Sequence, residues 1–276
     1  MTDRYAVIGN PIAQTKSPLI HGLFAEAARQ DMVYGAIEGA TAPGAFADTV
    51  RAFVAAGGKG LNVTAPFKLA AFALADERSE RAALAGAVNA LKFEDGRILA
   101  ENFDGIGLLR DIEDNLGVPL AGRRVLVLGA GGAARGLLLP FLTARPAELV
   151  LVNRDATKAE ALVAAVGEHG AVRACTCADL DALGRFDLVV NATSASLTSD
   201  LPAVPPGVFS PAGMAYELAY GKGLTPFLRL ARNAGVGRVV DGVGMLVEQA
   251  AEAFHWWRGV RPSTRAVIDR LTIPLT

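Results

Sequence analysis

The chain is poor in the residues that build metal sites, disulfide frameworks and nucleic-acid surfaces. Its 276 residues include two cysteines and three histidines, and the histidines are scattered without the spacing of a metal-ligand set. Lysine and arginine number 27 against 28 acidic residues, which gives a net charge of −1 and no basic block. Proteins that bind nucleic acid or anionic membranes carry such blocks. We therefore expect no metal site, no nucleic-acid partner and no membrane partner.

Long apolar runs are also lacking, and we expect no leader segment. No stretch reaches 18 uncharged apolar residues, and MTDRYAVIGN does not have the layout of a signal peptide. We expect a cytoplasmic protein. Cys175 and Cys177 of ACTCAD would point to the same side of a strand. Because no other cysteine could complete a site with them, we interpret them as two small residues of that strand.

Apolar side chains are abundant, at 51% of the chain, which is enough for a sizeable core. Short β-like runs alternate with helical stretches in two series, one from RYAVIGN to RILAEN and one from RRVLVLG to GRVVDG. AVNALKF and RILAEN flank Glu94-Asp95-Gly96, which predicts a hairpin at one edge. The alternation itself predicts mostly parallel, helix-covered sheets and an α/β fold.

The strongest local motif is VLVLGAGGAARG, an apolar strand that runs into a glycine-rich turn and then a helix. It matches G-x-G-x-x-A. Gly129 permits the tight turn, Gly131 lets the backbone approach a pyrophosphate, and Ala134 lets helix and strand pack closely. The helix N-terminus then offers free N–H groups to phosphates. The motif predicts a dinucleotide site formed by Gly129, Ala130, Gly131, Gly132, Ala133 and Ala134.

The second β/α series marks a change of domain. We therefore expect an N-terminal α/β domain for substrate binding and catalysis, 1–104, and an NAD(P)-binding Rossmann domain, 105–241. Helices in 242–276 are expected to return to the first domain, and the connections at both changes are short. We predict a cleft between the two domains. The sequence does not fix the oligomeric state, for which a monomer or a homodimer is expected.

The strand LVLVNRD indicates which dinucleotide would bind. Arg154 stands at the end of this strand and Lys158 follows one turn later, which favours the 2′-phosphate of NADP. Asp155 lies between them and would repel a phosphate or accept from a ribose hydroxyl. We therefore predict NADP, with NAD as the alternative.

The segment GNPIAQTKSPLIHG contains a potential anion seat. Ser17 followed by Pro18 is a typical helix start, with serine as the N-cap. The hydroxyls of Thr15 and Ser17 can converge beside the helix N-terminus, where the dipole favours a small anion such as a carboxylate. The alternative is that Ser17 only caps the helix.

Lys68 is the one charged residue in GLNVTAPFKLAAFALA, residues 60–75. The helix dipole disfavours a lysine in a first turn, so a role in stability is not expected. Oxidation of a secondary alcohol needs a hydride acceptor and a base for the hydroxyl proton. Lys68 could be that base, with Asp104 of ENFDGIG as its partner. A lysine that lies along the surface is the alternative.

Several sequence blocks together resemble a known family over nearly the whole chain. These blocks are YAVIGNPIAQTKSPLIH, NVTAPFK, AGAVNAL, NFDGIG, LGAGGAARG, NRD, NATSAS, YELAYGKGLTPFL and DGVGMLVEQAAEAF. In this order they resemble the shikimate dehydrogenase family. The resemblance implies NADP-dependent interconversion of 3-dehydroshikimate and shikimate, a step of aromatic amino-acid (chorismate) biosynthesis.

The resemblance also implies roles for individual residues. Thr15 and Ser17 would hold the substrate carboxylate, and Lys68 and Asp104 would be the catalytic pair. The substrate pocket would further include Asn62, Thr64, Asn89, Tyr220 and Gln249. The cofactor would contact the glycine-rich turn, Asn153, Arg154 and Lys158 at the 2′-phosphate, and Thr193, Met214, Gly242 and Met245.

Five positions depart from the family pattern. Thr15 and Phe103 replace a serine and a small polar residue, and both bear on substrate preference. Asp155 and Lys158 replace residues that are often threonine and arginine, and both bear on the choice between NADP and NAD. Glu217 replaces the usual aspartate.

Two alternatives to an NADP-dependent shikimate enzyme follow. A quinate/shikimate dehydrogenase that prefers NAD would share the catalytic residues. A non-catalytic metabolite sensor should have lost the catalytic pair, whereas this chain keeps both Lys68 and Asp104.

Overall fold

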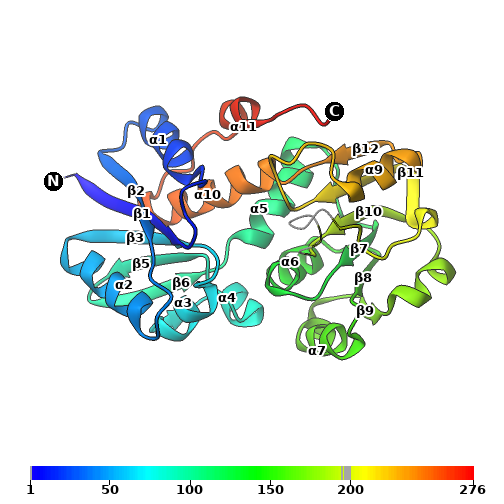
Figure 1. Ribbon diagram of the computed structural model, residues 1–276, viewed down its shortest axis with the longest axis horizontal. Helices are drawn as coiled ribbons and strands as arrows, with labels where there is room; N and C mark the ends of the chain where they lie inside the picture. The colour runs from blue at the N-terminus through cyan, green and yellow to red at the C-terminus, as the bar shows by residue number, and fades with distance from the viewer. Residues whose placement is uncertain (1, 194, 196–199) are drawn as a thin grey trace. The chain divides into compact units, whose positions relative to one another are not determined.

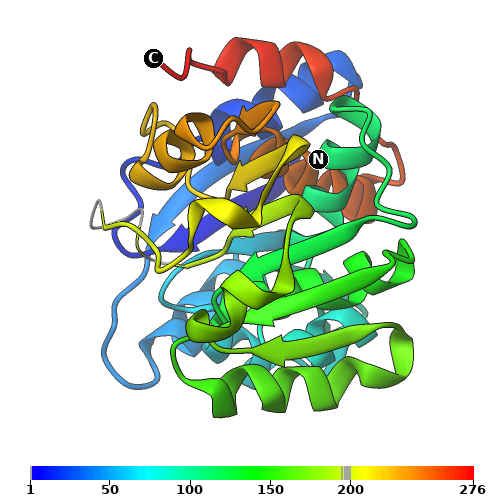
Figure 2. The ribbon, with the colours of Figure 1, turned by 90° about the vertical axis from the view of Figure 1, so that its right-hand side faces the viewer.

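The computed structural model describes residues 2–193, 195 and 200–276. Within the NATSAS block, Ser194 and Ser196 lie outside the described residues. Each half of the chain contains one six-stranded sheet with helices against it (Figures 1 and 2), which confirms the predicted α/β class. No helix among the described residues is both long and apolar enough to span a bilayer.

The chain divides into two compact units, and each contains two separate pieces of sequence. The first unit is Met1–Gly107 with Val247–Asp269, and the second is Leu108–Leu246 with Arg270–Thr276. The sequence predicted that the helices of 242–276 return to the first domain. Arg270–Thr276 instead belong to the second unit. Leu275 packs against the core of the second unit, and Arg232 Nη2 donates to its carbonyl at 2.6 Å.

The sheet of the first unit has the strand order β2-β1-β3-β5-β6-β4. β1 is parallel to both β2 and β3, whereas β3, β5 and β6 pair antiparallel. The predicted hairpin is confirmed, with Asp95 (φ 51°) and Gly96 (φ 76°) in the left-handed region, as tight hairpin turns require. The strands are β1 (Asp3–Gly9), β2 (Met32–Glu38), β3 (Gly58–Val63), β4 (Glu77–Arg78), β5 (Ala90–Glu94) and β6 (Arg97–Glu101).

Alternation along the strands gives this sheet two packed faces. Ile8 and Leu61 pack with Phe46 and Phe67 on one face, whereas Tyr5 packs with Ala90, Ala253 and Trp257 on the other. The helices that contribute are α1 (Ser17–Ala27), α2 (Ala45–Ala55), α3 (Lys68–Leu74), α4 (Glu80–Ala85), α5 (Asp104–Arg110), α10 (Val243–Arg258) and α11 (Arg265–Leu271). The carboxyl ends of β1 and β3 lead directly into the segments that carry Thr15 and Lys68.

The sheet of the second unit is parallel throughout, in the order β12-β11-β10-β7-β8-β9. Its strands are β7 (Arg124–Leu128), β8 (Glu148–Val152), β9 (Val172–Cys175), β10 (Phe186–Asn191), β11 (Phe209–Glu217) and β12 (Arg238–Val240), and its main helices are α6 (Gly132–Thr143), α7 (Ala156–Val166) and α9 (Pro226–Asn233). Counted from β7, this is the 3-2-1-4-5-6 order of the Rossmann fold, whose strand order reverses between β7 and β10. Ligands of such sheets bind at that switch point.

Two local expectations were wrong. Cys175 ends β9, but Cys177 starts a short 3₁₀ helix, so the two cysteines do not share a strand. Ser17 is the first residue of α1, and no side chain caps this helix at the preceding Lys16. The hydroxyl of Ser17 is instead occupied by other side chains, as described below.

Candidate active site and dinucleotide pocket

The two side chains of the predicted anion seat meet at the start of α1. Thr15 Oγ1 donates to Ser17 Oγ at 3.2 Å, and Ser17 N donates back to Thr15 Oγ1 at 3.3 Å. Ser17 is only 9% exposed. The two hydroxyls therefore converge beside the N-terminus of an eleven-residue helix, where dipole and O–H groups favour an anion.

Lys68 and Asp104 form an ion pair in the first unit, with 2.5 Å between Lys68 Nζ and Asp104 Oδ2. Lys68 begins α3 directly after the turn that ends β3, and Asp104 begins α5 two residues beyond the end of β6. Their side chains are 33% and 14% exposed, so the pair is partly screened from water but reachable. The predicted partners meet across 36 positions of sequence.

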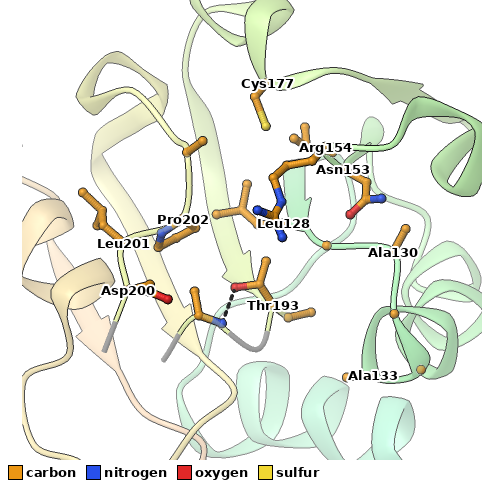
Figure 3. Close-up of a pocket in the computed structure, with 17 residues that line it drawn as sticks. Leu128, Ala130, Ala133, Asn153, Arg154, Cys177, Thr193, Asp200, Leu201 and Pro202 are labelled. Carbon is orange, nitrogen blue, oxygen red and sulfur yellow. Dashed lines mark hydrogen bonds between the residues drawn. The ribbon is translucent and has the colours of Figure 1, made fainter. Parts of the chain in front are cut away.

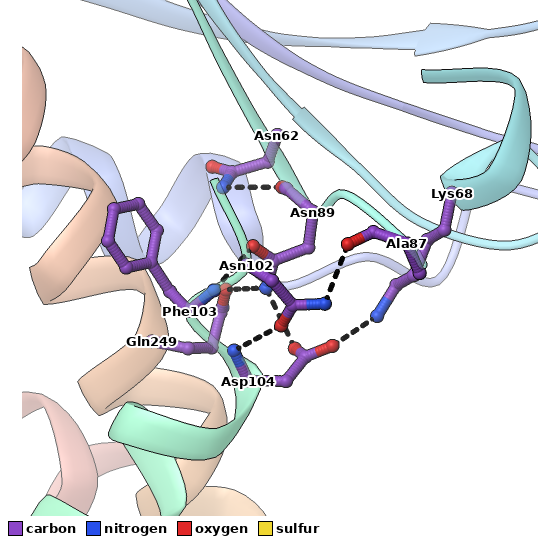
Figure 4. Close-up of polar contacts among 8 residues, drawn as sticks. All are labelled: Asn62, Lys68, Ala87, Asn89, Asn102, Phe103, Asp104 and Gln249. Carbon is purple, nitrogen blue, oxygen red and sulfur yellow. Dashed lines mark hydrogen bonds and ion pairs between the residues drawn. The ribbon is translucent and has the colours of Figure 1, made fainter. Parts of the chain in front are cut away.

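Asn89 occupies the centre of the polar site (Figure 4). Its Nδ2 donates to Asp104 Oδ1 at 2.8 Å and to Gln249 Oε1 at 3.5 Å. Its Oδ1 accepts from the backbone N–H of Phe103 at 2.9 Å. Asp104 is thus held by a lysine on one oxygen and by an amide on the other. The distance to Gln249 also shows that α10 folds back onto the N-terminal part of the chain.

Asn102 belongs to this site, although the sequence analysis did not single it out. Its Oδ1 accepts from the Asp104 backbone N–H at 3.1 Å, and its Nδ2 donates to the Ala87 carbonyl at 3.0 Å. The side chain is 1% exposed. Asn102 therefore ties the start of α5 to the loop before Asn89 and fixes the backbone of the acidic residue. Its place beside Asp104 in ENFDGIG was the available signal.

Phe103 does not narrow the polar site. Its ring is 3% exposed and meets Trp256 edge-on, with 5.7 Å between ring centroids. Figure 4 shows the ring directed away from Lys68 and the Asp104 carboxylate. Only the backbone N–H of Phe103 contributes to the network around Asn89. Phe103 can therefore affect substrate specificity only because the small polar side chain that is usual at this position is missing.

Asn62 and Thr64 lie at the carboxyl end of β3, next to this network. Asn62 is 7% exposed, its Nδ2 donates to the Asn89 carbonyl at 3.3 Å, and its Oδ1 accepts from the Tyr34 hydroxyl at 2.6 Å. Thr64 follows the strand, where its N–H pairs with the Ile8 carbonyl at 2.9 Å. Tyr34 is a second residue that the sequence analysis missed, because nothing marks a tyrosine inside an ordinary strand.

The second unit contains a cavity of about 610 Å³ at its switch point (Figure 3). The end of β7, the glycine-rich turn, the end of β8 and the segment after β10 surround it. Of the predicted cofactor residues, the following line it: Gly129, Ala130, Gly131, Gly132, Ala133, Asn153, Arg154 and Thr193. This is the expected location for the ligand of a Rossmann sheet.

The glycines of the turn serve two different needs. Gly129 has φ +102°, and a Cβ there would lie 3.1 Å from the Ala192 carbonyl oxygen, so the turn itself requires glycine. A Cβ at Gly131 or Gly132 would meet nothing within 4 Å. These two residues therefore leave backbone N–H groups uncovered at the start of α6, which suits an approaching phosphate.

Arg154 and Lys158 differ in their surroundings. Within the described part of the chain, the Arg154 guanidinium has no hydrogen-bond or ion-pair partner, and it lines the cavity. Lys158 is exposed and lies 3.7 Å from Asp155, while Asn153 Nδ2 donates to the Asp155 carbonyl at 3.0 Å. The Arg154 guanidinium is therefore available to bind a ligand phosphate. The Asp155 carboxylate, which would repel a phosphate, already lies near the Lys158 ammonium.

Lys158 does not line this cavity, and neither do four other cofactor residues of the prediction. Ala134 is fully buried and packs within the unit, and Met214 is 2% exposed on β11. Gly242 and Met245 lie around the start of α10. Tyr220 belongs to the second unit, and burial raises the pKa of its hydroxyl. The roles assigned to these residues stay predictions.

A buried polar network supports Thr193. Asn191 Oδ1 accepts from Thr193 Oγ1 at 2.7 Å, and Asn191 Nδ2 donates to Glu217 Oε2 at 2.9 Å. Thr225 Oγ1 also donates to Glu217 Oε2 at 3.2 Å. Asn191 and Glu217 are both 0% exposed. The glutamate that departs from the family pattern thus fits by bridging β10 and the start of α9.

A Rossmann sheet with its glycine-rich turn at the switch point, and a separate polar site around a Lys–Asp pair, define a dinucleotide-dependent oxidoreductase of the α/β class. Three family models match the chain: the shikimate dehydrogenase substrate binding domain at residues 7–91, shikimate / quinate 5-dehydrogenase at 111–199, and the shikimate 5′-dehydrogenase C-terminal domain at 242–272. The chain belongs to the shikimate dehydrogenase family.

Proteins that match nearly the whole chain include two that are named as shikimate dehydrogenases. A shikimate dehydrogenase (NADP(+)) of Chromobacterium violaceum is 53% identical over 98% of both chains. An Ael1 enzyme from Pseudomonas putida is 67% identical with a TM-score of 0.96 over 100% of both chains. A shikimate 5-dehydrogenase from Thermus thermophilus, solved with NADP(H) and shikimate, is 33% identical with a TM-score of 0.85 over 97% of this chain and 98% of that one.

Proposed function

We propose that the protein catalyses the reversible, NADP-dependent reduction of 3-dehydroshikimate to shikimate, with Lys68 and Asp104 as the acid–base pair. The relatives at about half identity carry the name of this activity. The observation that carries the proposal is the 2.5 Å ion pair of Lys68 and Asp104 inside a ring of amide side chains in the same unit as the hydroxyl seat.

The polar site has the groups that a hydroxylated ring acid needs. Thr15 and Ser17 supply hydroxyl donors for the carboxylate, next to the positive end of α1. Asn62, Asn89 and Gln249 supply amides for the ring hydroxyls. A substrate that lacks one of these hydroxyls would leave a buried amide unpaired, which costs about 1–3 kcal/mol. Recognition by several such groups therefore rejects analogues.

The proton is handled between Lys68 and Asp104. Bound NADP⁺ supplies the hydride acceptor. In the direction of alcohol oxidation, the Lys68 amine takes the hydroxyl proton, and in reduction the ammonium returns it to the carbonyl oxygen. Asp104 accepts from Lys68 on Oδ2 and from Asn89 on Oδ1. It thereby orients the lysine and keeps one lone pair on each oxygen for a substrate hydroxyl.

NADP rather than NAD is supported by the unpaired Arg154 at the cavity. A guanidinium gives a phosphate two parallel hydrogen bonds, whereas a ribose hydroxyl needs only an acceptor. Lys158 would supply a second cation for the 2′-phosphate when the phosphate replaces Asp155 as its partner. The cytoplasmic location and the monomeric or homodimeric state stay predictions.

The test is to follow nicotinamide reduction with shikimate and with quinate, each paired with NADP⁺ and with NAD⁺. We expect kcat/KM for shikimate with NADP⁺ to exceed the other three values by at least about a hundredfold. Comparable rates with quinate or NAD⁺ would assign the protein to the quinate/shikimate enzymes. No turnover with any pair would contradict the proposed activity and favour a metabolite sensor.

A further inference from the structure

The sheet of the first unit ends on one side at β2, an edge strand that lacks the usual protection (Figure 1). Exposed edges pair readily with other chains, so native edge strands commonly carry lysine, proline or a β-bulge. β2 pairs with β1 over seven residues without a register shift, and its one charged residue, Glu38, is the last. Val33 is 53% exposed. The single chain therefore leaves a regular, mostly uncharged edge open.

Alternate residues of β2 direct their backbone groups away from the sheet. Asp3 N donates to the Asp31 carbonyl at 3.3 Å, and Gly39 N donates to the Gly9 carbonyl at 3.0 Å. The odd-numbered residues of β2 therefore face β1, because this direction alternates along a strand. The N–H and C=O groups that face outward belong to Met32, Tyr34, Ala36 and Glu38. Within the described part of the chain, these groups have no hydrogen bond to another element.

A second copy of β2 fits this edge in one antiparallel register. With Gly35 opposite its own copy, Met32 faces Glu38. Tyr34 then faces Ala36, so all the outward-facing residues form hydrogen-bonded pairs, which exchange N–H and C=O groups in both directions. Any other register leaves at least one of them without such a pair. Because the two copies are related by a two-fold axis through Gly35, the contact is isologous and closed.

The side chains suit the same register. Val33 and Ile37 share one face of β2, and Ile37 packs against the core on that face. The pairing sets the exposed Val33 against Ile37 of the second copy, with about 4.5–5.5 Å between their Cβ atoms. Like charges in opposite positions would destabilise the pairing. None occur in this register, because Glu38 lies opposite a methionine and Asp31 opposite a glycine.

Gly35 has no explanation within the single chain. A Cβ at this position would meet nothing within 4 Å, and its φ lies outside the left-handed region. Glycine inside a strand costs about 0.5–1 kcal/mol relative to alanine. It often marks a place where another backbone approaches closely. The centre of the antiparallel pairing, where two copies of Gly35 face each other, is such a place.

We propose that two copies of this chain form a homodimer through β2, paired antiparallel about Gly35, so that the sheets of their first units join into one continuous sheet. Of the two oligomeric states expected from the sequence, this selects the homodimer and gives it a surface. The inference uses only the edge of the first unit and does not depend on the proposed activity.

The first test is the mass of the full chain in solution, measured by light scattering after gel filtration at micromolar concentration. Wild-type protein should have twice the chain mass of 28.7 kDa. Val33→Lys and Ala36→Pro should each raise the dimer dissociation constant at least about a hundredfold, because every change occurs twice in an isologous contact. Val54→Lys, at a 38% exposed valine of α2, is the control and should stay dimeric.

Both edge variants should keep the fold of the single chain. Val33 is exposed, and Ala36→Pro removes an outward N–H, which is where an edge strand tolerates proline. Circular dichroism should therefore match that of Val54→Lys. Wild-type protein at the mass of one chain would overturn the inference. A dimer that survives both edge variants would overturn it as well, because the contact would then lie elsewhere.

A cysteine cross-link tests the register. In a background with Cys175→Ser and Cys177→Ser, which removes both native thiols, Gly35→Cys should form an intermolecular disulfide on mild oxidation. The two copies of this residue face each other across the axis, within the reach of a disulfide. Ala36→Cys is displaced from its own copy along the strand, so it should cross-link at least about tenfold more slowly. No cross-link at residue 35, or equal rates at 35 and 36, would contradict this pairing.

Discussion

At the scale of single residues, the proposed acid–base pair is asymmetric. Asp104 is fixed by side chains on both oxygens and by Asn102 at its backbone N–H. Lys68 has one described ion-pair partner and a side chain that is 33% exposed. The lysine therefore has fewer described contacts than the aspartate, which supports the proposal that Lys68 exchanges the proton with the substrate.

Replacing Lys68 should remove turnover and leave binding. Lys68→Ala is expected to lower kcat by at least about a thousandfold, within the range of general acid–base catalysis. Shikimate affinity should fall only a few-fold, because the carboxylate seat and amides remain. Steady-state rates with calorimetry check this, and Lys59→Ala, an exposed lysine of β3, is the control. A fully active Lys68→Ala protein would disprove the mechanism.

His21 should make stability depend on pH. Burial lowers the pKa of His21 to about 3, against about 6.5 in an unfolded chain. Between these values only the unfolded state binds the proton, so stability falls as pH decreases from 6.5. The loss should be roughly 3 kcal/mol between pH 6.5 and 4. Urea unfolding of His21→Phe should show a weaker pH dependence over this range, and an equal dependence would contradict the argument.

At the scale of elements, close backbone approach brings Gln249 to the proposed active site. A Cβ on Gly107 of α5 would lie 2.6 Å from the Gln249 backbone nitrogen and 2.7 Å from its Cβ. The two helices can therefore touch only because residue 107 has no side chain. Gly60 of β3 similarly leaves room for the Trp257 indole, whose Nε1 donates to the Leu91 carbonyl at 3.0 Å.

Gly107→Ala should push α10 away from Asn89. We expect a loss of about 1–3 kcal/mol in unfolding free energy from the overpacking, together with a higher KM for shikimate and an unchanged KM for NADP⁺. Gly22→Ala is the control, because a Cβ there meets nothing within 4 Å and alanine favours the exposed helix by about 0.5–1 kcal/mol. Denaturant unfolding and steady-state kinetics distinguish the two variants.

At the scale of the whole molecule, the two proposed binding regions belong to different units. The hydroxyl seat, the acid–base pair and Gln249 lie in the first unit, whereas the glycine-rich turn and Arg154 lie in the second. Each ligand alone should therefore order its own unit.

Hydrogen exchange can test this separation. Shikimate alone should slow exchange at the end of β3 and the start of α5, and NADP⁺ alone should slow it in the β7–α6 turn. Each effect should appear without the other ligand, because a ligand stabilises the state that it binds. Protection of the turn by shikimate alone, at the same level as by NADP⁺, would contradict independent sites.

The sequence predicted most of the architecture but few of the long-range contacts. The two β/α series, the hairpin and the Rossmann turn follow local patterns, and they were confirmed. β4 has two residues and no periodicity, and Tyr34 meets Asn62 across 28 positions, so local patterns could not reveal either. The return of Gln249 across 160 positions to Asn89 was predicted from family resemblance, since spacing carries no information about it.

The interrupted first unit has a consequence for how the protein is made. Its sheet is translated first, but Val247–Asp269, which completes that unit, is translated only after nearly all of the second unit. Trp257 and Phe254 of this segment then pack on one face of the sheet, where the Trp257 ring contacts Tyr34 and the Phe254 ring contacts His21. Domains tend to fold as they leave the ribosome. One face of the N-terminal sheet therefore stays uncovered until Val247–Asp269 has been synthesised. A nascent chain gains its proposed substrate site only after Val247–Asp269 has been synthesised, whereas its dinucleotide turn can form earlier.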